Sequence, residues 1–166
     1  MLDSLLKYLE DANFATAIRE GSVLFPWIEC VHVLALTLVI GSIAVVDLRL
    51  MGVTSRDRGV AEITAGVLPV TWTAFGFAVV TGFLLFSSNA TTYGGNAFFR
   101  IKMLLLVLAG VNMGLYHLVI SRGAENWQTA EATPTRARIA GAVSLFLWLG
   151  IIAAGRWIGF TINAPA

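Results

Sequence analysis

Four runs of about twenty or more mostly apolar residues limit this chain to a helical, membrane-spanning fold. The runs cover 26–50, 65–86, 101–120 and 139–162, and polar connections separate them. An α-helix needs about 20 such residues to cross the hydrocarbon core of a bilayer. Only 13% of the residues are charged, about half the share found in soluble domains. We therefore predict an all-α polytopic membrane protein, a four-transmembrane-helix bundle that forms one domain over residues 1–166.

Residues 1–22 precede the first span and have the pattern of an amphipathic helix. Leucines recur at helical spacing, and charged residues lie between them. The leucines are Leu2, Leu5, Leu6 and Leu9, and the charged residues are Asp3, Lys7, Glu10 and Asp11. This pattern predicts a helix that lies in the membrane interface rather than across the bilayer.

Local signals in the spans carry three further structural predictions. Pro69 is expected to bend the second span near its start. Thr133 and Pro134 are expected to be the cap and the first residue of the fourth span. Small residues four positions apart favour close helix packing. These pairs are Gly110 with Gly114, Ala140 with Ser144, and Gly155 with Gly159.

Basic residues are more frequent in the first and third connections than at the opposite ends of the spans. The first group is Arg49, Arg56, Arg58, Arg122, Arg136 and Arg138, and the second is Lys7, Arg19, Arg100 and Lys102. The positive-inside rule places the connections that are richer in arginine in the cytoplasm and both termini outside.

Composition and motifs exclude several classes of function. The net charge is +1 and the basic residues form no stripe, so no nucleic-acid partner is indicated. The single cysteine, Cys30, excludes an internal disulfide and a multi-cysteine metal site. No phosphate-binding glycine loop and no nucleophile triad is present. These exclusions direct attention to ionisable residues within the spans, where charge is costly and usually functional.

Four such residues lie at similar depth near the outer face. Depth is counted from the middle of each span at about 1.5 Å per residue. His32 and Arg156 then lie about 9 Å outward, and Glu29 and Lys102 lie roughly 13 Å outward. Trp157, beside Arg156, is placed to line the same site. The sequence therefore predicts an outer-leaflet cofactor-binding site formed by these five residues.

Several chemistries fit this predicted site. Lys102 and Arg156 could receive the propionates of haem b, with His32 as an axial metal ligand and Met103 as its partner. Alternatively, His32 could hydrogen-bond a quinone carbonyl while Glu29 relays its proton. Glu29 and His32 could also be metal ligands, although two ligands are few for a metal site. In a purely structural alternative, Glu29 neutralises one of the two cations and His32 is a hydrogen-bonding bundle residue.

A second group of polar residues lies toward the inner face. His117 is about 9 Å inward and Asp47 about 13 Å inward, with Arg49 just beyond and Asn112 near the midplane. We expect Asp47 and Arg49 to pair across helices or to reach the interface, and His117 to hydrogen-bond within the bundle. Because His32 and His117 are roughly 18 Å apart in depth, they cannot clamp one haem iron between them.

The chain resembles an uncharacterised family of small bacterial four-helix integral membrane proteins. The resemblance rests on the segments "ECVHVLALTLVIGSIAVVDLRLMG", "WTAFGFAVVTGFLLF", "NAFFRIKMLLLVLAGVNMGLYH" and "SLFLWLGIIAAGRWIGF". It implies a bacterial integral membrane protein and implies no particular activity. Its motif positions here are Glu29, His32, Asp47, Arg49, Lys102, Asn112, His117 and Arg156. A looser likeness connects the chain to cytochrome b-type and copper-resistance-type membrane bundles at the level of fold.

Three functions follow from these residues as hypotheses. The first is an integral-membrane redox subunit that binds haem or quinone in the outer layer, within a homo-oligomer or a larger membrane complex. The second is a small proton or ion transporter or channel, for which few polar residues lie near the midplane. The third is a non-catalytic membrane anchor or assembly subunit.

Overall fold

The computed structural model describes residues 1–122, 124–127, 129 and 133–162, and all regular elements in this part of the chain are helices. The four long helices are α3 (Leu24–Leu50), α4 (Val60–Ser88), α6 (Ala97–Leu115) and α7 (Thr135–Thr161). The short elements are α1 (Leu2–Glu10), α2 (Asn13–Glu20), α5 (Ala90–Gly95), the π-helix η1 (Tyr116–Ile120), which continues α6, and the 3₁₀ helix η2 (Ala124–Asn126). Four segments are long and apolar enough to cross a membrane. The predicted four-helix fold is confirmed.

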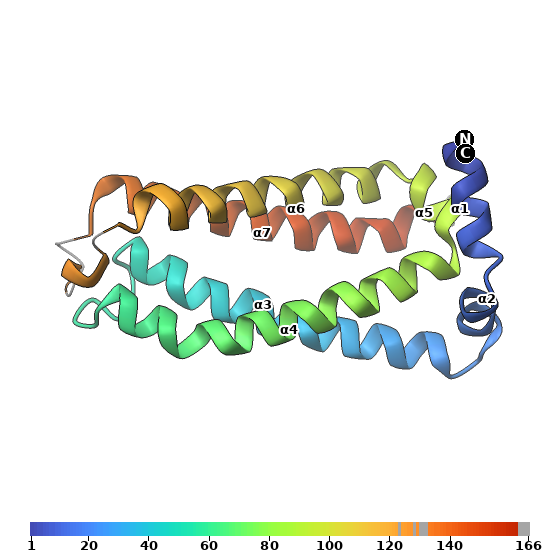
Figure 1. Ribbon diagram of the computed structural model, residues 1–166, viewed down its shortest axis with the longest axis horizontal. Coiled ribbons are helices and arrows are strands. Elements are labelled where there is room, and N and C mark those ends of the chain that lie inside the picture. The colour runs from blue at the N-terminus through green and yellow to red at the C-terminus, as the bar shows by residue number, and fades with distance from the viewer. Residues whose placement is uncertain (123, 128, 130–132, 163–166) are drawn as a thin grey trace.

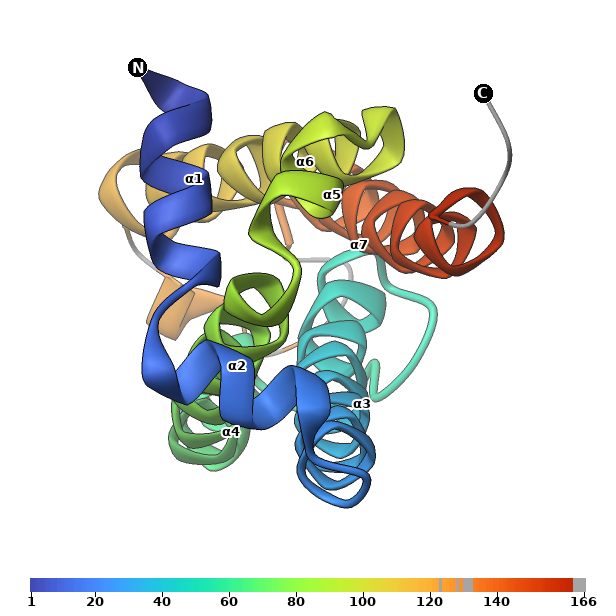
Figure 2. The ribbon, with the colours of Figure 1, turned by 90° about the vertical axis from the view of Figure 1, so that its right-hand side faces the viewer.

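The long helices form two antiparallel pairs, α3 with α4 and α6 with α7, which lie one above the other in Figure 1. The pairs meet where α7 packs against α3. On the other side of the bundle, no Cα atom of α4 lies within 8 Å of one in α6, in the part of the chain that the structure describes. The end-on view in Figure 2 shows the same two pairs. The bundle is therefore closed along α3 and α7. Along α4 and α6 the backbones stay further apart, and we call this the open side, although the rings of Phe86 and Phe99 stack across it at one end, with centroids 5.1 Å apart.

Close packing of α7 on α3 depends on Gly141. A Cβ added to Gly141 would lie 3.0 Å from the Asp47 carbonyl oxygen and 3.1 Å from Leu50 Cβ. Small residues allow such close approach between membrane helices. The predicted contacts at Gly110, Gly114 and Gly159 are wrong, because an added Cβ there would meet no described atom within 4 Å. At two other predicted positions the contact is present: Ala140 is buried in the core, and Gly155 faces Lys102 of α6.

The helix ends differ from the predictions in detail. The fourth span begins at Thr135, with Pro134 as its cap residue, so the predicted role of Thr133 as cap is wrong. The Thr133 hydroxyl instead accepts a hydrogen bond from Arg49. Asn96, which the sequence analysis did not single out, caps α6 by accepting from the amides of Phe98 and Phe99. The second span continues as helix through Pro69.

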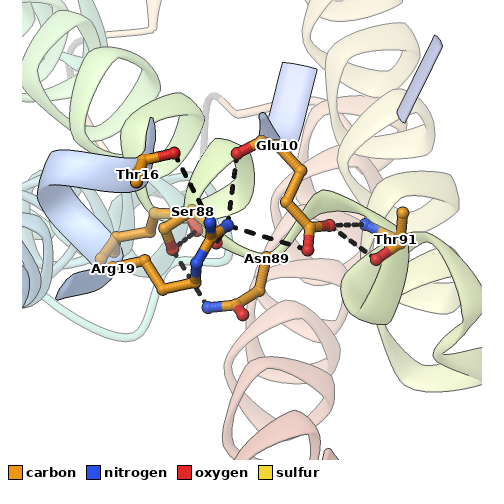
Figure 3. Close-up of polar contacts among 7 residues, drawn as sticks. Glu10, Thr16, Arg19, Ser88, Asn89 and Thr91 are labelled. Atoms are coloured by element: carbon orange, nitrogen blue, oxygen red, sulfur yellow. Dashed lines mark hydrogen bonds and ion pairs between the residues drawn. The ribbon is translucent and has the colours of Figure 1, made fainter. Parts of the chain in front are cut away.

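The N-terminal segment lies across one end of the bundle. The predicted single helix is divided into α1 and α2, because Ala12 has an extended backbone, and both helices run across the bundle axis (Figures 1 and 2). Figure 3 shows the contacts that hold them. Glu10 Oε2 accepts from the amide and the hydroxyl of Thr91, at 2.8 and 2.6 Å. Arg19 Nη1 donates to the carbonyls of Glu10 and Ser88, at 3.2 and 3.1 Å.

The attachment of α1 is expected to weaken at acidic pH. The hydrogen bond from the Thr91 hydroxyl holds the pKa of Glu10 below its usual value of 4.5. A carboxylate with a lowered folded-state pKa stabilises the fold above the unfolded-state pKa, and this contribution is lost as pH falls through the folded-state pKa. The hydrogen-exchange protection of the Thr91 amide should therefore be constant from pH 7 to about 5 and fall below pH 4.5. In Glu10→Gln the protection should be lower and independent of pH; a pH profile like that of the wild type would contradict the assignment.

The opposite end of the bundle is held by Arg49, whose side chain is 0% exposed. Its Nε donates to the Arg58 carbonyl at 2.6 Å, Nη1 to the Thr133 hydroxyl at 3.1 Å, and Nη2 to the Trp127 carbonyl at 3.3 Å. Arg49 therefore ties the end of α3 to the two connections on that side of the bundle. Of the two alternatives expected for Arg49, reaching the interface is wrong, because the side chain is fully buried.

Candidate functional site

A cavity of about 650 Å³ lies between the two helix pairs. Most of its lining is apolar, and it extends to the open side of the bundle, where Phe83 is 52% and Met113 45% exposed although both line it. Other lining residues on this side are Phe75 and Val79 of α4 and Met103 and Gly110 of α6. The cavity is therefore reached from the lipid between α4 and α6. Its polar side chains gather mainly at two ends, which we name the His32 end and the Asp47 end.

At the His32 end, hydrogen bonds fix the state of the imidazole. His32 Nδ1 lies 2.9 Å from the Thr81 hydroxyl oxygen. That hydroxyl has one proton, and the Phe77 carbonyl at 2.6 Å is its shortest acceptor; with the proton placed there, the hydroxyl accepts from His32. The carbonyl of Ala78 also lies within hydrogen-bonding reach of the ring. We therefore assign the proton of the neutral ring to Nδ1, which leaves Nε2 as an acceptor or a ligand.

Lys102 faces the same end of the cavity from α6. It lines the cavity together with His32, and its positive charge acts on the His32 ring. A glycine faces each of these side chains, and the approach is tight at Gly82 and an ordinary van der Waals contact at Gly155. A Cβ at Gly82 would lie 3.0 Å from His32 Cε1, and one at Gly155 would lie 3.8 Å from Lys102 Nζ. The structure thus brings together the imidazole and the ammonium group that the depth count placed in one layer.

Three residues of the predicted site lie outside the cavity lining. Arg156 is exposed, and its guanidinium lies 5.0 Å from the centre of the Phe160 ring. Trp157 is exposed and contacts the rings of Phe98 and Phe160. Gly155 is the residue of α7 that faces Lys102. Arg156 and Trp157 follow it in the helix, so their side chains point in other directions around α7 and do not line the cavity.

Glu29 is the third of these residues. It is exposed and does not line the cavity. Its charge instead acts on Tyr93 in α5: burial and, second, the negative charge of Glu29 raise the pKa of that phenol. Of the predicted five residues, the cavity therefore gathers His32 and Lys102.

The Asp47 end contains most of the predicted inner layer and more. Asp47, Asn112 and His117 line it, and so do Thr64, Tyr116 and Ser144. Asn112 donates to the Ala140 carbonyl at 3.1 Å. His117 makes an edge contact with the Tyr116 ring, at 5.3 Å between centroids, and no hydrogen bond joins it to Asp47 among the described residues. Asp47 is therefore not the partner of the hydrogen bond that we expect His117 to make within the bundle.

Two hydroxyls lie between the ends of the cavity. Ser42 of α3 and Thr71 of α4 both line it, and their oxygens are 2.8 Å apart. The sequence analysis missed this contact and Thr64, and it named Ser144 for helix packing rather than for a site. Serine and threonine side chains often bond to their own helix, as Thr71 does to the Val67 carbonyl, so their presence in a span does not by itself indicate a site.

No group of three or more potential metal-ligating side chains of His, Cys, Asp or Glu occurs among the described residues. The two histidines line opposite ends of the cavity. His32 bonds to Thr81. His117 lies beside Tyr116, and Tyr116 is near enough to Asp47 for its charge to act on the phenol. The 15 residues of α3 between His32 and Asp47 span about 22 Å. This arrangement agrees with the depth argument against one haem between two histidines.

Residues 11–161 match a protein family described as a family of unknown function, DUF6644. The chain belongs to this family. The match covers all four spans and every side chain that lines the cavity of this DUF6644 protein. It confirms the resemblance to an uncharacterised family, and the family description assigns no activity. No curated protein and no solved structure matches the chain.

Proposed function

We propose that this protein binds a quinone in its cavity and serves as an integral-membrane redox subunit. The observation that carries the proposal is a mostly apolar cavity, open to the lipid, with His32 and Lys102 at one end. Ligand sites are typically concave, mostly apolar and about 300–1,000 Å³ in volume, with a few polar groups that orient the ligand. The 650 Å³ cavity meets each of these conditions.

The chemistry of the His32 end suits both redox forms of a quinone. The Lys102 ammonium is a charged donor for a carbonyl oxygen. His32 Nε2, with the proton fixed on Nδ1 by Thr81, is an acceptor for the hydroxyl of the reduced form. The apolar tail of the quinone would then leave the cavity between α4 and α6, where Phe83 and Met113 line it and are exposed.

The proposal includes a location and an orientation. The excess of arginine in the connections at the Asp47 end favours the cytoplasm for that end. The His32 end would then lie in the outer leaflet of a bacterial inner membrane, with both termini in the periplasm. Electrons would pass to or from the quinone through a partner, either a second copy of this chain or another subunit of a larger membrane complex.

Quinone binding can be measured with the tryptophans that line the cavity. Trp148 is buried against it and Trp72 lies on its open side. A short-tailed benzoquinone analogue titrated into the purified protein should quench tryptophan fluorescence to saturation, and solvent extraction should release quinone from protein purified from membranes. Trp148→Phe should lose much of the quenching. Linear, non-saturating quenching together with no extracted quinone would contradict the proposal.

A b-type haem is a second candidate cofactor, and the residues of the cavity suit it in part. His32 Nε2 is open to a metal, and its Nδ1 is held by Thr81, as the second nitrogen of a ligating histidine usually is. Met103 also lines the cavity. However, Lys102 alone would meet the propionates, because Arg156 lies outside the lining. An absorption spectrum separates the two cofactors, since only haem gives a Soret band.

A small proton or ion transporter is a candidate from another class, and one observation favours it. The contact between Ser42 and Thr71 supplies hydroxyls between the two ends of the cavity, where the sequence alone had offered few polar groups. Ion or proton flux into liposomes that contain the purified protein tests this function. Flux that is unchanged in His32→Ala and His117→Ala would exclude the predicted route.

A further inference from the structure

The Asp47 end of the cavity holds a buried carboxylic acid. Among the described residues, no basic side chain bonds to its Oδ2 atom. Asp47 is 6% exposed, and its Oδ2 has no hydrogen-bonding partner among the described residues. It lies in a membrane-spanning helix and lines the cavity. A lone negative charge in surroundings of low dielectric is costly unless it is paired or neutralised. An acid kept in such a position is by default a functional group.

The groups around Asp47 offer oxygen ligands. Ser144 of α7 is within hydrogen-bonding range of the carboxylate. Thr64 of α4 lines the same cavity, and its buried hydroxyl oxygen also has no described partner. Two buried, unpartnered oxygen atoms in one cavity, contributed by neighbouring helices, are unusual, because buried polar atoms are normally satisfied. They indicate a ligand that both oxygens can bind.

We propose that the Asp47 end of the cavity binds one monovalent cation, a proton or Na⁺, held by the Asp47 carboxylate and the hydroxyls of Thr64 and Ser144. One carboxylate balances one positive charge, whereas a divalent ion would leave an uncompensated charge in the hydrocarbon region. Oxygen atoms are the ligands that hard cations prefer. The site is distinct from the His32 end and does not depend on quinone binding there.

The local helix geometry is also unusual at this end. The last five residues of the third span form the π-helix η1, which carries Tyr116 and His117. Such π-helical turns are often found at functional sites. Tyr116 and His117 are the titratable groups that line this end from the third span, whereas α4 and α7 contribute the hydroxyls of Thr64 and Ser144. Arg49, two residues beyond Asp47, directs its guanidinium to the carbonyls of Arg58 and Trp127 and to Thr133.

Infrared difference spectroscopy of the protein in lipid nanodiscs tests this site. Spectra are compared between NaCl and choline chloride at pH 7, and between pH 8 and pH 5 in choline chloride. A carboxyl C=O band that Na⁺ removes, and that is absent in Asp47→Asn, identifies Na⁺ as the cation. A band that responds to pH but not to Na⁺, and is absent in Asp47→Asn, identifies the proton. Difference spectra that are the same in Asp47→Asn and the wild type would overturn the proposal.

Matched variants separate the site from general charge effects and from misfolding. Asp57→Asn, which removes an exposed acid from the connection after α3, should leave the difference spectra unchanged. Thr64→Val and Ser144→Ala keep the carboxylate and nearly the same volume. If the cation is Na⁺, each variant is expected to weaken its binding by about tenfold. If the cation is a proton, each is expected to shift the titration midpoint by about one pH unit. If Asp47→Asn does not fold, an unchanged cation response in both hydroxyl variants would still overturn the proposal.

Discussion

Arg49→Met is expected to lower the free energy of unfolding by about 3 kcal/mol. Methionine has a similar length and can occupy much of the same space, but it cannot donate to the three oxygens that Arg49 contacts. The carbonyls of Arg58 and Trp127 and the hydroxyl of Thr133 would lose their charged donor, and the bonds to Trp127 and Thr133 are fully buried. Leaving buried acceptors unsatisfied costs more than the net value of the hydrogen bonds themselves.

The shape of the guanidinium matters as much as its charge. Nε, Nη1 and Nη2 each donate to a different segment: the connection after α3, the residue that precedes Pro134, and the connection after η2. A lysine has one ammonium group and cannot donate in three fixed directions at once. We therefore expect Arg49→Lys to recover only part of the stability, and to loosen the two connections rather than the spans.

Reversible unfolding in mixtures of dodecyl sulfate and mild detergent, followed by circular dichroism, measures both effects. The matched control is Arg122→Met, because Arg122 is exposed at the same end of the bundle. This control should change the unfolding free energy by less than about 0.5 kcal/mol. If Arg49→Met and Arg122→Met are equally stable, the three hydrogen bonds do not hold the connections.

The fold follows from features that a single sequence carries. Spans of this length in a bilayer must be helices, because every backbone polar group needs an internal partner. Which faces of the helices meet is decided by close packing of particular side chains, and this information is not local. Gly141 is the clearest example: it lies against the Asp47 carbonyl, yet nothing in its sequence surroundings separates it from Gly110 or Gly114.

The same distinction explains which site residues were predicted. Counting residues along a span gives depth, and depth correctly associated His32 with Lys102. It does not give the direction in which a side chain points around the helix. Arg156 follows Gly155, which faces Lys102, so it is rotated by about 100° around α7 and lies over Phe160 on the outer surface. Glu29 has the right depth for the site and likewise lies outside the cavity.

Lys102→Met and His32→Ala are each expected to reduce the affinity for a quinone analogue by about 10- to 100-fold. The loss of a hydrogen bond that involves a charged group costs about 1.5–3 kcal/mol, and 1.4 kcal/mol corresponds to a factor of ten in affinity. Arg100→Met is the matched control for the lysine, because Arg100 is exposed on the same helix and bonds to the Gly94 carbonyl. His117→Ala is the matched control for the histidine, because His117 lines the opposite end of the cavity.

The pattern across these four variants decides which end of the cavity binds the quinone. Equal losses in His32→Ala and His117→Ala would place the headgroup elsewhere or indicate general disruption of the bundle.

A further variant tests the role assigned to Thr81. Thr81→Val removes the acceptor that fixes the proton on His32 Nδ1, so affinity should fall by roughly tenfold. Thr81→Ser keeps the hydroxyl and should bind as the wild type does. If valine and serine have the same effect, Thr81 contributes packing alone, and Nε2 is not held ready to accept a hydrogen bond from the ligand.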